Sequence, residues 1–158
     1  MNVPSWLLWG FVATLALTIL SMGAEGAGLT RMSYADLLGL AFTPNRDRAK
    51  VVGFATHMVL GLAYSLVYVL IFQAIDAAGW WRGSLLGIAQ GFFVLIVVMK
   101  LLPALHPRMA SEQSGPSAKR VLEPPGFLAL HYGVQTPLVV LLSHGFYGAI
   151  LGGFYRLR

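Results

Sequence analysis

The feature that most constrains this chain is a set of four long stretches without a single Asp, Glu, Lys or Arg. They cover residues 1–24, 51–75, 83–99 and 124–155. A helix of roughly 20 apolar residues spans the hydrocarbon core of a bilayer, and each stretch approaches or exceeds that length. Charged residues make up only 11% of the chain, against roughly 25% in a soluble domain. So few charges do not cover a water-exposed core, and the bilayer is the expected solvent.

The uncharged stretches predict four membrane-spanning helices. We expect them over residues 6–22, 51–73, 83–102 and 137–155. The last stretch is too long for one span, and Gly133 with Pro137 divides it into a short interfacial piece over residues 127–132 and the fourth span. A cleaved signal peptide is the competing interpretation of the first stretch, but no Lys or Arg precedes it. The expected fold is all-α, a four-helix transmembrane bundle forming a single domain over residues 1–158.

Basic residues fall mostly on one side of these spans. The two long connections hold eight of them, Arg31, Arg46, Arg48, Lys50, Lys100, Arg108, Lys119 and Arg120. The other side holds three, Arg82, Arg156 and Arg158. Basic residues favour the cytoplasmic side, so we expect both long connections inside and both termini outside, in a bacterial cytoplasmic membrane. A belt of aromatic anchors at the outer interface then consists of Trp6, Trp9, Trp80 and Trp81.

The second and fourth spans share the pattern [Ser/Thr]-His-x3-Gly-x6-Tyr, over residues 56–68 and 143–155. Each His lies seven residues beyond the residue that marks entry into its span, which is about 10 Å of helical rise. The pattern predicts two parallel repeats of two helices each, over residues 1–75 and 76–158, related by a pseudo-twofold axis along the membrane normal. Because the match includes few identities, coincidence is the alternative.

Each repeat also has a short apolar piece in its cytoplasmic connection, over residues 33–42 and 126–132. In the first of them Asp36 faces water while the leucines around it can lie at the headgroup boundary. We therefore expect two short amphipathic helices at the cytoplasmic interface. They are either plain connectors or elements that cover the bundle as a lid.

Small residues recur at helical spacing on two of the spans. Gly83, Gly87 and Gly91 lie four residues apart on the third span, as do Gly148 and Gly152 on the fourth. Small residues at this spacing let helix backbones approach closely in lipid. One such face serves packing within the bundle, and a second indicates contact with another subunit or with a flat cofactor. Packing within the chain alone is the simpler alternative.

Intramembrane histidines mark the candidate functional residues. The candidate cofactor-binding residues are His57, Gly61, Tyr68, His144, Gly148 and Tyr155. Each set of three lies on one stripe of its helix. An imidazole that faced lipid would lose its hydrogen bonds, so we expect both stripes to face the protein interior, with the two imidazoles at one depth.

Four interpretations of the two histidines stay open. In the first, each neutral imidazole bonds a Tyr, Ser or Thr across the bundle and is purely structural. In the second, the pair holds a haem or a chlorophyll-type ring, with the histidines as metal ligands and the adjacent glycines making room. In the third, the histidines line a path for protons or a small solute with Gln90, Glu25 and Lys100. In the fourth, they chelate a metal ion with Met58.

Recognisable catalytic motifs are absent from the sequence. There is no phosphate-binding loop, no dinucleotide fingerprint and no zinc-protease helix motif. With no cysteine, thiolate chemistry and iron–sulfur clusters are excluded. Ser143 adjoins His144, but neighbouring side chains on a helix point about 100° apart and do not form a nucleophile and base pair. We therefore expect no enzyme, and no nucleic-acid partner, because the basic residues lie between apolar blocks.

Three short runs resemble a family of small four-span bacterial membrane proteins without an assigned activity. The runs are Pro107-Arg108-Met109-Ala110-Ser111-Glu112, Leu122-Glu123-Pro124-Pro125-Gly126-Phe127 and His144-x3-Gly148-Ala149-Ile150-Leu151-Gly152. The likeness covers most of the chain. It implies the four-span architecture and no reaction, ligand or functional residue.

The expected function is that of an accessory or scaffold subunit in the lipid bilayer, which packs by its glycine faces into a homo-oligomer or a larger membrane complex. The first alternative is a membrane protein that carries haem or a (bacterio)chlorophyll-type ring through His57 and His144. The second alternative is a small pathway for protons or a solute.

Overall fold

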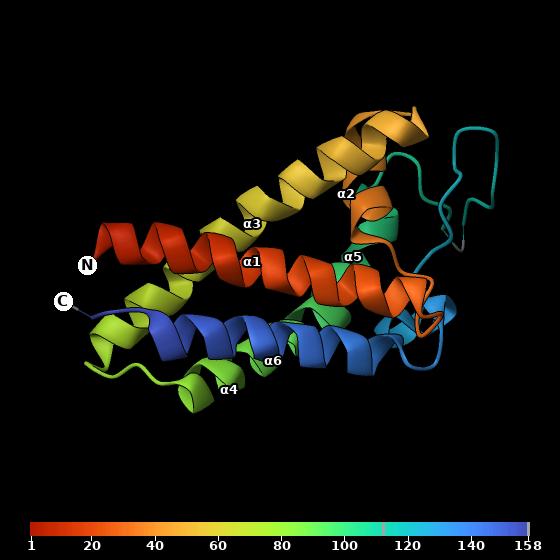
Figure 1. Cartoon of the computed structure of the whole chain (residues 1–158). Coiled ribbons are helices and arrows are strands. Elements are labelled where there is room, and N and C mark those ends of the chain that lie inside the picture. Colours follow the sequence, from red (N-terminus) through yellow and green to blue (C-terminus); the bar gives the residue numbers. More distant parts are fainter. Residues whose placement is uncertain (112, 158) are drawn as a thin grey trace.

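The computed structural model describes residues 1–111 and 113–157, and this part of the chain is helical apart from its connections. The elements in order are α1 (Val3–Gly26), α2 (Tyr34–Phe42), α3 (Arg46–Ala74), α4 (Trp80–Phe93), the π-helical segment η1 (Val94–Val98), α5 (Met99–Leu105), the 3-10 segment η2 (Phe127–Tyr132) and α6 (Thr136–Phe154). Figure 1 shows both termini at one end of the bundle, here the terminal end, and the long connections at the other, the connection end.

Within the described residues, four helices are long and apolar enough to span a membrane, which confirms the predicted number of spans. They are α1, α3, α6 and the continuous helix Trp80–Leu105 that α4, η1 and α5 form together. The third helix is a few residues longer at each end than predicted. It begins directly after Gly79, whose φ of 155° favours glycine, and so it includes Arg82 in its first turn.

Asparagine side chains start two of the long helices. The side chain of Asn2 accepts a hydrogen bond from the backbone N–H of Ser5 at 3.0 Å, and Asn45 accepts one from Arg48 at 3.0 Å. Each bond satisfies a backbone donor that the first helical turn leaves without a partner. Pro4 adds a fixed φ to the first turn of α1, where its missing N–H costs nothing. These caps fix where α1 and α3 begin.

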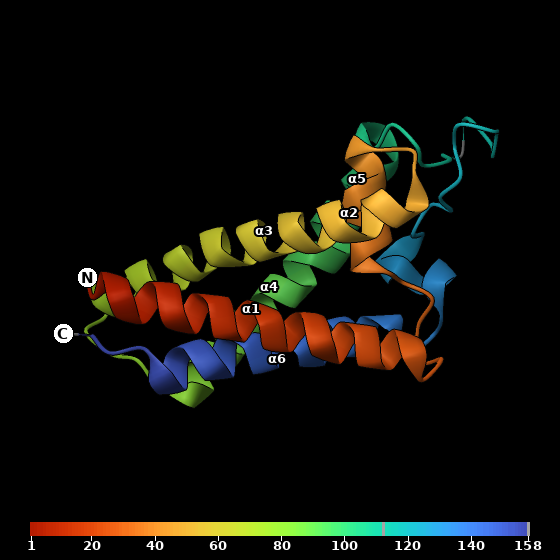
Figure 2. The same cartoon turned by 45° about the horizontal axis from the view of Figure 1, so that its top comes forward.

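The four long helices form a bundle in which one side is not closed by packing. α6 packs against α4 along most of its length and against α1 on its other side, and α1 packs against α3. α3 and α4 are not among the packed helix pairs of the described residues. Figures 1 and 2 show α3 inclined away from α1 and α6 toward the connection end, where α2 and α5 lie.

Glycines bring α4 and α6 into backbone contact. A Cβ placed on Gly83 would lie 1.9 Å from the carbonyl oxygen of Gly148, and one on Gly148 would lie 1.9 Å from that of Gly83. Gly87 meets the His144 carbonyl in the same way, and Gly152 meets that of Gly79. The two glycine rows that the sequence predicts therefore pack against each other within this chain.

α1 and α3 meet closely near the terminal end and then separate. A Cβ on Gly61 would lie 2.2 Å from the methyl group of Thr14, and one on Gly10 would lie 2.5 Å from the hydroxyl of Ser65. α2 packs on α3 where these helices have moved apart, and a Cβ on Gly53 would lie 1.9 Å from the carbonyl of Ala35. The splay between α1 and α3, together with α2, provides the space in which both cavities described below are found.

The short connection elements differ from the prediction in two respects, since leucines of the first are buried against protein instead of at the headgroup boundary and the second is not a regular helix. The first apolar piece forms α2 with Ser33 as its N-cap, and Leu37 and Leu40 are buried against protein. The second piece, η2, is a 3-10 segment rather than a regular amphipathic helix, because Leu128 and Ala129 have φ values of 50° and 60°. The sequence gives no glycine at those two positions to indicate this bend.

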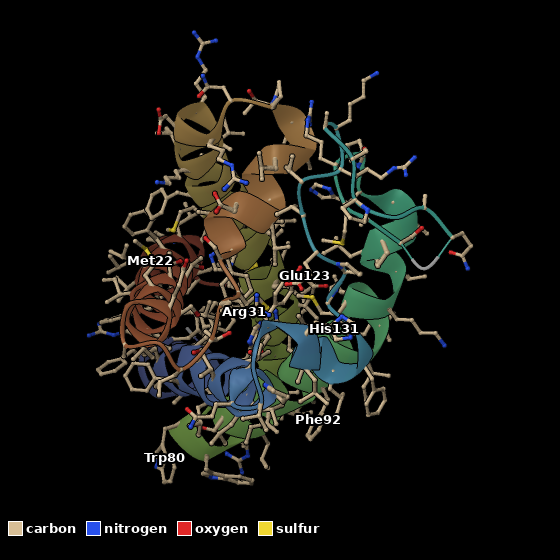
Figure 3. The ribbon with its side chains drawn as sticks, turned by 90° about the vertical axis from the view of Figure 1, so that its right-hand side faces the viewer. Met22, Arg31, Trp80, Phe92, Glu123 and His131 are labelled. Carbon is tan, nitrogen blue, oxygen red and sulfur yellow. The ribbon has the colours of Figure 1, made fainter. Side chains whose placement is uncertain are left out.

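The two halves of the chain are joined at the connection end. Arg31 donates its backbone N–H to the carbonyl of Tyr132 at 2.7 Å and forms an exposed ion pair with Glu123 at 3.1 Å. Figure 3 shows Arg31, Glu123 and His131 together at this end, with Met22 on the outer side of α1. The predicted two-helix repeat remains a prediction. In the second pair α4 packs against α6, while α5, which continues the same helix, lies beside α2 at the connection end (Figure 2).

Candidate functional site

A pocket of about 260 Å³ lies inside the bundle and contains both predicted histidines. Its polar lining residues include His57, His144, Tyr34, Tyr64, Gln90 and Tyr147. Most of the remaining wall is leucine, valine and methionine from α1, α2, α3 and the helix formed by α4, η1 and α5. Leu60 on α3 lines the pocket with 41% of its surface exposed. The pocket is thus apolar, with a few polar groups directed into it, as is typical of ligand sites.

The hydrogen bonds of His57 determine which of its nitrogens carries hydrogen. Nδ1 of His57 lies 2.9 Å from the hydroxyl oxygen of Thr18. That hydroxyl also lies 2.8 Å from the carbonyl of Thr14, and with its one hydrogen directed to this carbonyl it accepts from the imidazole. His57 therefore has its hydrogen on Nδ1 and a lone pair on Nε2. The ring of Tyr34 stacks on the imidazole with centroids 4.9 Å apart.

His144 reaches the same tautomer by a different bond. Its Nδ1 lies 2.8 Å from the carbonyl oxygen of Val140, one turn earlier in α6, and a carbonyl only accepts. The lone pair of His144 is therefore also on Nε2. Within the described residues, no hydrogen bond reaches Nε2 of either His57 or His144. The pocket thus receives two imidazoles that each retain an unused acceptor.

The other predicted site residues lie outside the pocket, apart from Gly61. The hydroxyl of Tyr68 donates to Oε1 of Gln90 at 2.6 Å, and Tyr155 receives a hydrogen bond from Gln73 at 3.1 Å near the terminal end. Gly148 belongs to the contact between α4 and α6. A Cβ on Gly91, at the far end of the α4 row, would lie 3.1 Å from the side chain and 3.3 Å from the Cα of Leu141, so this contact is less close. The structure therefore brings together only the His and Gly of the first motif and the His of the second.

Two aromatic residues of the pocket were not predicted from the sequence. Tyr147 follows His144 by three residues on the same face of α6, and its hydroxyl donates to the carbonyl of Gly61 at 2.6 Å. Helical spacing could have indicated it. Tyr34 comes from α2, between the first two spans, and no spacing rule connects it with a histidine on α3.

A π-helical segment forms part of the pocket wall. η1 interrupts the third long helix, and its first and last residues, Val94 and Val98, both line the pocket. π-helical turns are rare and occur frequently at functional sites. Pro103 follows within α5 and lacks a backbone donor. The third helix is thus locally irregular at the level of the pocket, where regular helix continues on α3 and α6.

The connection after α5 holds α2 in place beside the pocket. Nε2 of His106 donates to the carbonyl of Leu37 at 3.0 Å, and its Nδ1 accepts the backbone N–H of Arg108 at 3.1 Å. Arg108 also bonds the carbonyl of Leu40 with its guanidinium. Burial lowers the pKa of His106, with a smaller lowering by Arg108, although the bond to Leu37 acts in the opposite direction. A neutral His106 therefore holds the helix that carries Tyr34.

Of the remaining predicted polar residues, Glu25 lies near the connection end of α1 and Lys100 is exposed on α5. Within the described residues, the one ion pair is that of Arg31 with Glu123. No group of three or more His, Asp or Glu side chains that could hold a metal ion is present in the described chain.

No protein-family model, curated protein or solved structure matches this chain. The resemblance to small four-span bacterial membrane proteins therefore remains a prediction from the sequence.

Proposed function

We propose that this chain is an integral membrane protein that binds a lipid-soluble molecule in the pocket, through a head group that donates hydrogen bonds to His57 and His144. The observation that carries the proposal is the pair of Nε2 lone pairs without a protein partner in an apolar pocket. Neither Nε2 is among the fully buried atoms of the described residues that lack a partner, so each is accessible to a molecule in the pocket. Hydroxyl or N–H groups of a bound molecule would supply the donors that the protein does not.

A purely structural role explains the donor nitrogen of each imidazole but not the acceptor nitrogen. A neutral imidazole has one donor and one acceptor, and a structural histidine inside a membrane protein is expected to use both. Here the donors of His57 and His144 are used and the acceptors are not. The tautomers favour a ligand over packing alone.

A ring cofactor with a central metal uses the same lone pairs, because Nε2 of a neutral histidine is a common ligand of haem iron. The pocket volume of about 260 Å³ is slightly below the range of roughly 300–1,000 Å³ that holds drug-sized ligands. It accommodates a small head group more readily than a whole tetrapyrrole. Binding of such a ring is therefore the second outcome that the experiment below distinguishes.

The scaffold function rested on glycine faces that were expected to be free for a partner. Those faces occupy each other between α4 and α6, so a partner subunit would have to use a different surface. Leu60 of the pocket wall is 41% exposed on α3, where the bilayer would cover it, so the pocket reaches lipid there. For the same reason a molecule dissolved in the bilayer, rather than one in water, is the proposed ligand. The excess of basic residues at the connection end favours a bacterial cytoplasmic membrane with that end inside.

The test is co-purification of a small molecule in mild detergent, measured by mass spectrometry of the extract and by an absorption spectrum. The variants are His57→Asn and His144→Asn, because asparagine keeps an amide donor near the place of Nδ1 and has nothing at Nε2. His131→Asn is the matched control, since His131 is exposed and bonds the carbonyl of Pro124 at the connection end.

We expect one lipid-soluble species with hydroxyl or N–H groups in the native protein and in His131→Asn, and its loss from both pocket variants. A porphyrin-type absorption band that disappears in the pocket variants would show that the bound molecule is a ring cofactor and not the proposed ligand. A native protein that carries no small molecule, or variants that retain it, would contradict the proposal.

A further inference from the structure

A second cavity of about 430 Å³ adjoins the first on the side of the connection end. It lies between α1 and α3 where they have separated, with α2 beside them. Its polar lining residues are Thr18, Ser21, Glu25, Ser33, Tyr34, Asp36, Lys50 and His57. Two carboxylates against one ammonium give this lining a net charge of one negative unit. The first pocket, in contrast, has no charged residue in its wall.

Several buried polar atoms at the second cavity have no protein partner. They are the hydroxyl oxygens of Ser21 and Tyr34 and one carboxylate oxygen of Asp36. Ser21 is only 4% exposed, and its hydroxyl faces that of Tyr34 without reaching hydrogen-bond geometry. Glu25, Ser33 and Lys50 add further polar groups to the lining of this cavity. A cavity of this size with several polar partners is one that water occupies readily.

His57 and Tyr34 line both cavities and form the wall that the two share. Nδ1 of His57 bonds Thr18, which lines the second cavity and not the first, and the imidazole itself lines both cavities. Burial raises the pKa of Tyr34 above its ordinary value of 10, so the phenol keeps its proton. His57 is the group in this wall that can both accept and release one.

We propose that the second cavity is filled with water from the connection end, and that His57 exchanges protons between this water and the head group of the molecule in the pocket. The second part rests on the proposed function. The head group gives its hydrogen-bonded proton to Nε2 and becomes an anion, and the imidazolium then gives its Nδ1 proton to water beside Thr18. One proton passes from the molecule to water, no electron moves, and the reverse sequence returns it.

The groups that face His57 are consistent with this exchange. Toward the pocket they are uncharged, namely Tyr34 from α2, Tyr64 from α3, Gln90 from α4 and His144 with Tyr147 from α6. Toward the second cavity they include Glu25 from α1, Asp36 from α2 and Lys50 from α3. The net negative charge on that side favours a proton that leaves through Nδ1.

The water route is tested by cysteine labelling, which is clean because the chain has no cysteine of its own. Ser21→Cys places a thiol in the second cavity, and Ile19→Cys places one at nearly the same depth of α1 on its outer face, where Ile19 is 60% exposed. The probe is a membrane-impermeant, positively charged methanethiosulfonate, applied to protein reconstituted in liposomes. Glu25→Cys is a second cavity variant, in case Ser21→Cys does not fold.

We expect the cavity thiol to react roughly tenfold or more faster than the lipid-facing thiol, because apolar surroundings suppress the thiolate that reacts. Equal, slow reaction of Ser21→Cys, Glu25→Cys and Ile19→Cys would show a dry cavity and overturn the water route. This outcome does not depend on whether a molecule occupies the first pocket.

The proton exchange is tested by ¹⁵N NMR of the labelled histidines after transfer into D2O. His144 is the internal control, because its Nδ1 hydrogen is bonded to Val140 and it does not line the second cavity. We expect the Nδ1 hydrogen of His57 to exchange roughly tenfold or more faster than that of His144. Ser21→Leu, which fills the cavity, should slow His57 alone.

Equal exchange at the two histidines would overturn the role of His57, whatever the labelling shows. If the thiols react and His57 exchanges rapidly in a protein that carries no small molecule, the water route stands and the proposed ligand falls. The two proposals therefore fail in distinguishable ways.

Discussion

The hydroxyl of Tyr68 on α3 donates a 2.6 Å hydrogen bond to Oε1 of Gln90 on α4. Tyr68 is buried, with 3% of its surface exposed, and its ring meets that of Tyr147 edge-on at 5.4 Å. Because α3 and α4 do not pack along their lengths, this bond joins two helices that are otherwise apart. Gln90 also lines the pocket, so the bond from Tyr68 fixes the position of a polar side chain in the pocket wall.

Removing this bond should destabilise the bundle by a modest and measurable amount. Tyr68→Phe leaves the amide oxygen of Gln90 without its donor, and we expect a loss of about 1 kcal/mol. Gln90→Leu removes the acceptor, and the double variant should show a coupling energy near 0.6 kcal/mol, the average for hydrogen bonds between membrane helices. The measurement is unfolding in detergent micelles. Tyr64→Phe is the control, and a coupling of zero would contradict the role assigned to the bond.

A methyl group at the contact between α4 and α6 should force these helices apart. In Gly148→Ala the new Cβ would lie 1.9 Å from the Gly83 carbonyl, a rigid backbone atom. Overpacking of this kind costs roughly 1–3 kcal/mol and occasionally more. Gly23→Ala is the matched control, since it also lies in a helix and meets nothing within 4 Å. We expect the thermal midpoint in detergent to fall for Gly148→Ala and to stay or rise for Gly23→Ala, and equal effects would exclude close packing.

The spans and the glycine rows could be predicted from the sequence because each follows from the composition or spacing of a single helix. Gly83 and Gly87 show their shared face by lying four residues apart, and nothing else in the chain is needed to recognise it. Which face they meet depends on tertiary structure. From the sequence, a partner subunit could have covered this glycine face, and in the structure α6 covers it.

The candidate site was predicted less completely, because its geometry comes from several elements at once. His57 and His144 share a motif and a pocket, yet one bonds a hydroxyl on α1 and the other its own backbone. Tyr68 and Tyr155 are equivalent in the motif and lie in different surroundings. The spacing of residues along one helix does not predict how α1 crosses α3 or where α2 packs. Those two features create both cavities.

Low pH should weaken the contact between α2 and the segment after α5, because this contact includes His106. Burial lowers the pKa of this imidazole from its ordinary value of 6.5, so the unfolded chain takes up the proton at a higher pH than the folded chain does. Stability is therefore full above the unfolded pKa of about 6.5 and falls as the pH drops toward the lowered folded value. Protonation would also set an N–H at Nδ1 against the N–H of Arg108.

The measurement is the thermal midpoint in detergent as a function of pH, compared between the native protein and His106→Gln. The variant keeps an amide donor for Leu37 and does not titrate in this range, so its midpoint should depend less on pH below 6.5. Parallel curves for the two proteins would show that another group causes the acid dependence.

Thr18 should control the tautomer of His57. Its hydroxyl is committed to the carbonyl of Thr14 and can only accept from Nδ1. Thr18→Val removes that acceptor while keeping the shape of the side chain, and Thr18→Ser keeps the acceptor and loses a methyl group. With valine we expect ¹⁵N NMR to show a mixture of the two tautomers at His57, since neither nitrogen then has a fixed partner. With serine the hydrogen should stay on Nδ1.

The same pair of variants links the tautomer to ligand binding. If the lone pair on Nε2 holds the molecule in the pocket, Thr18→Val should reduce the amount that co-purifies, roughly in proportion to the population of the Nδ1–H tautomer. Thr18→Ser should retain it. His144 has its own backbone acceptor and keeps its tautomer in both variants, so the loss should be partial where His57→Asn is expected to abolish binding. An unchanged His57 spectrum in Thr18→Val would mean that Thr18 does not determine the tautomer, and the orientation of the two acceptors would need a different cause.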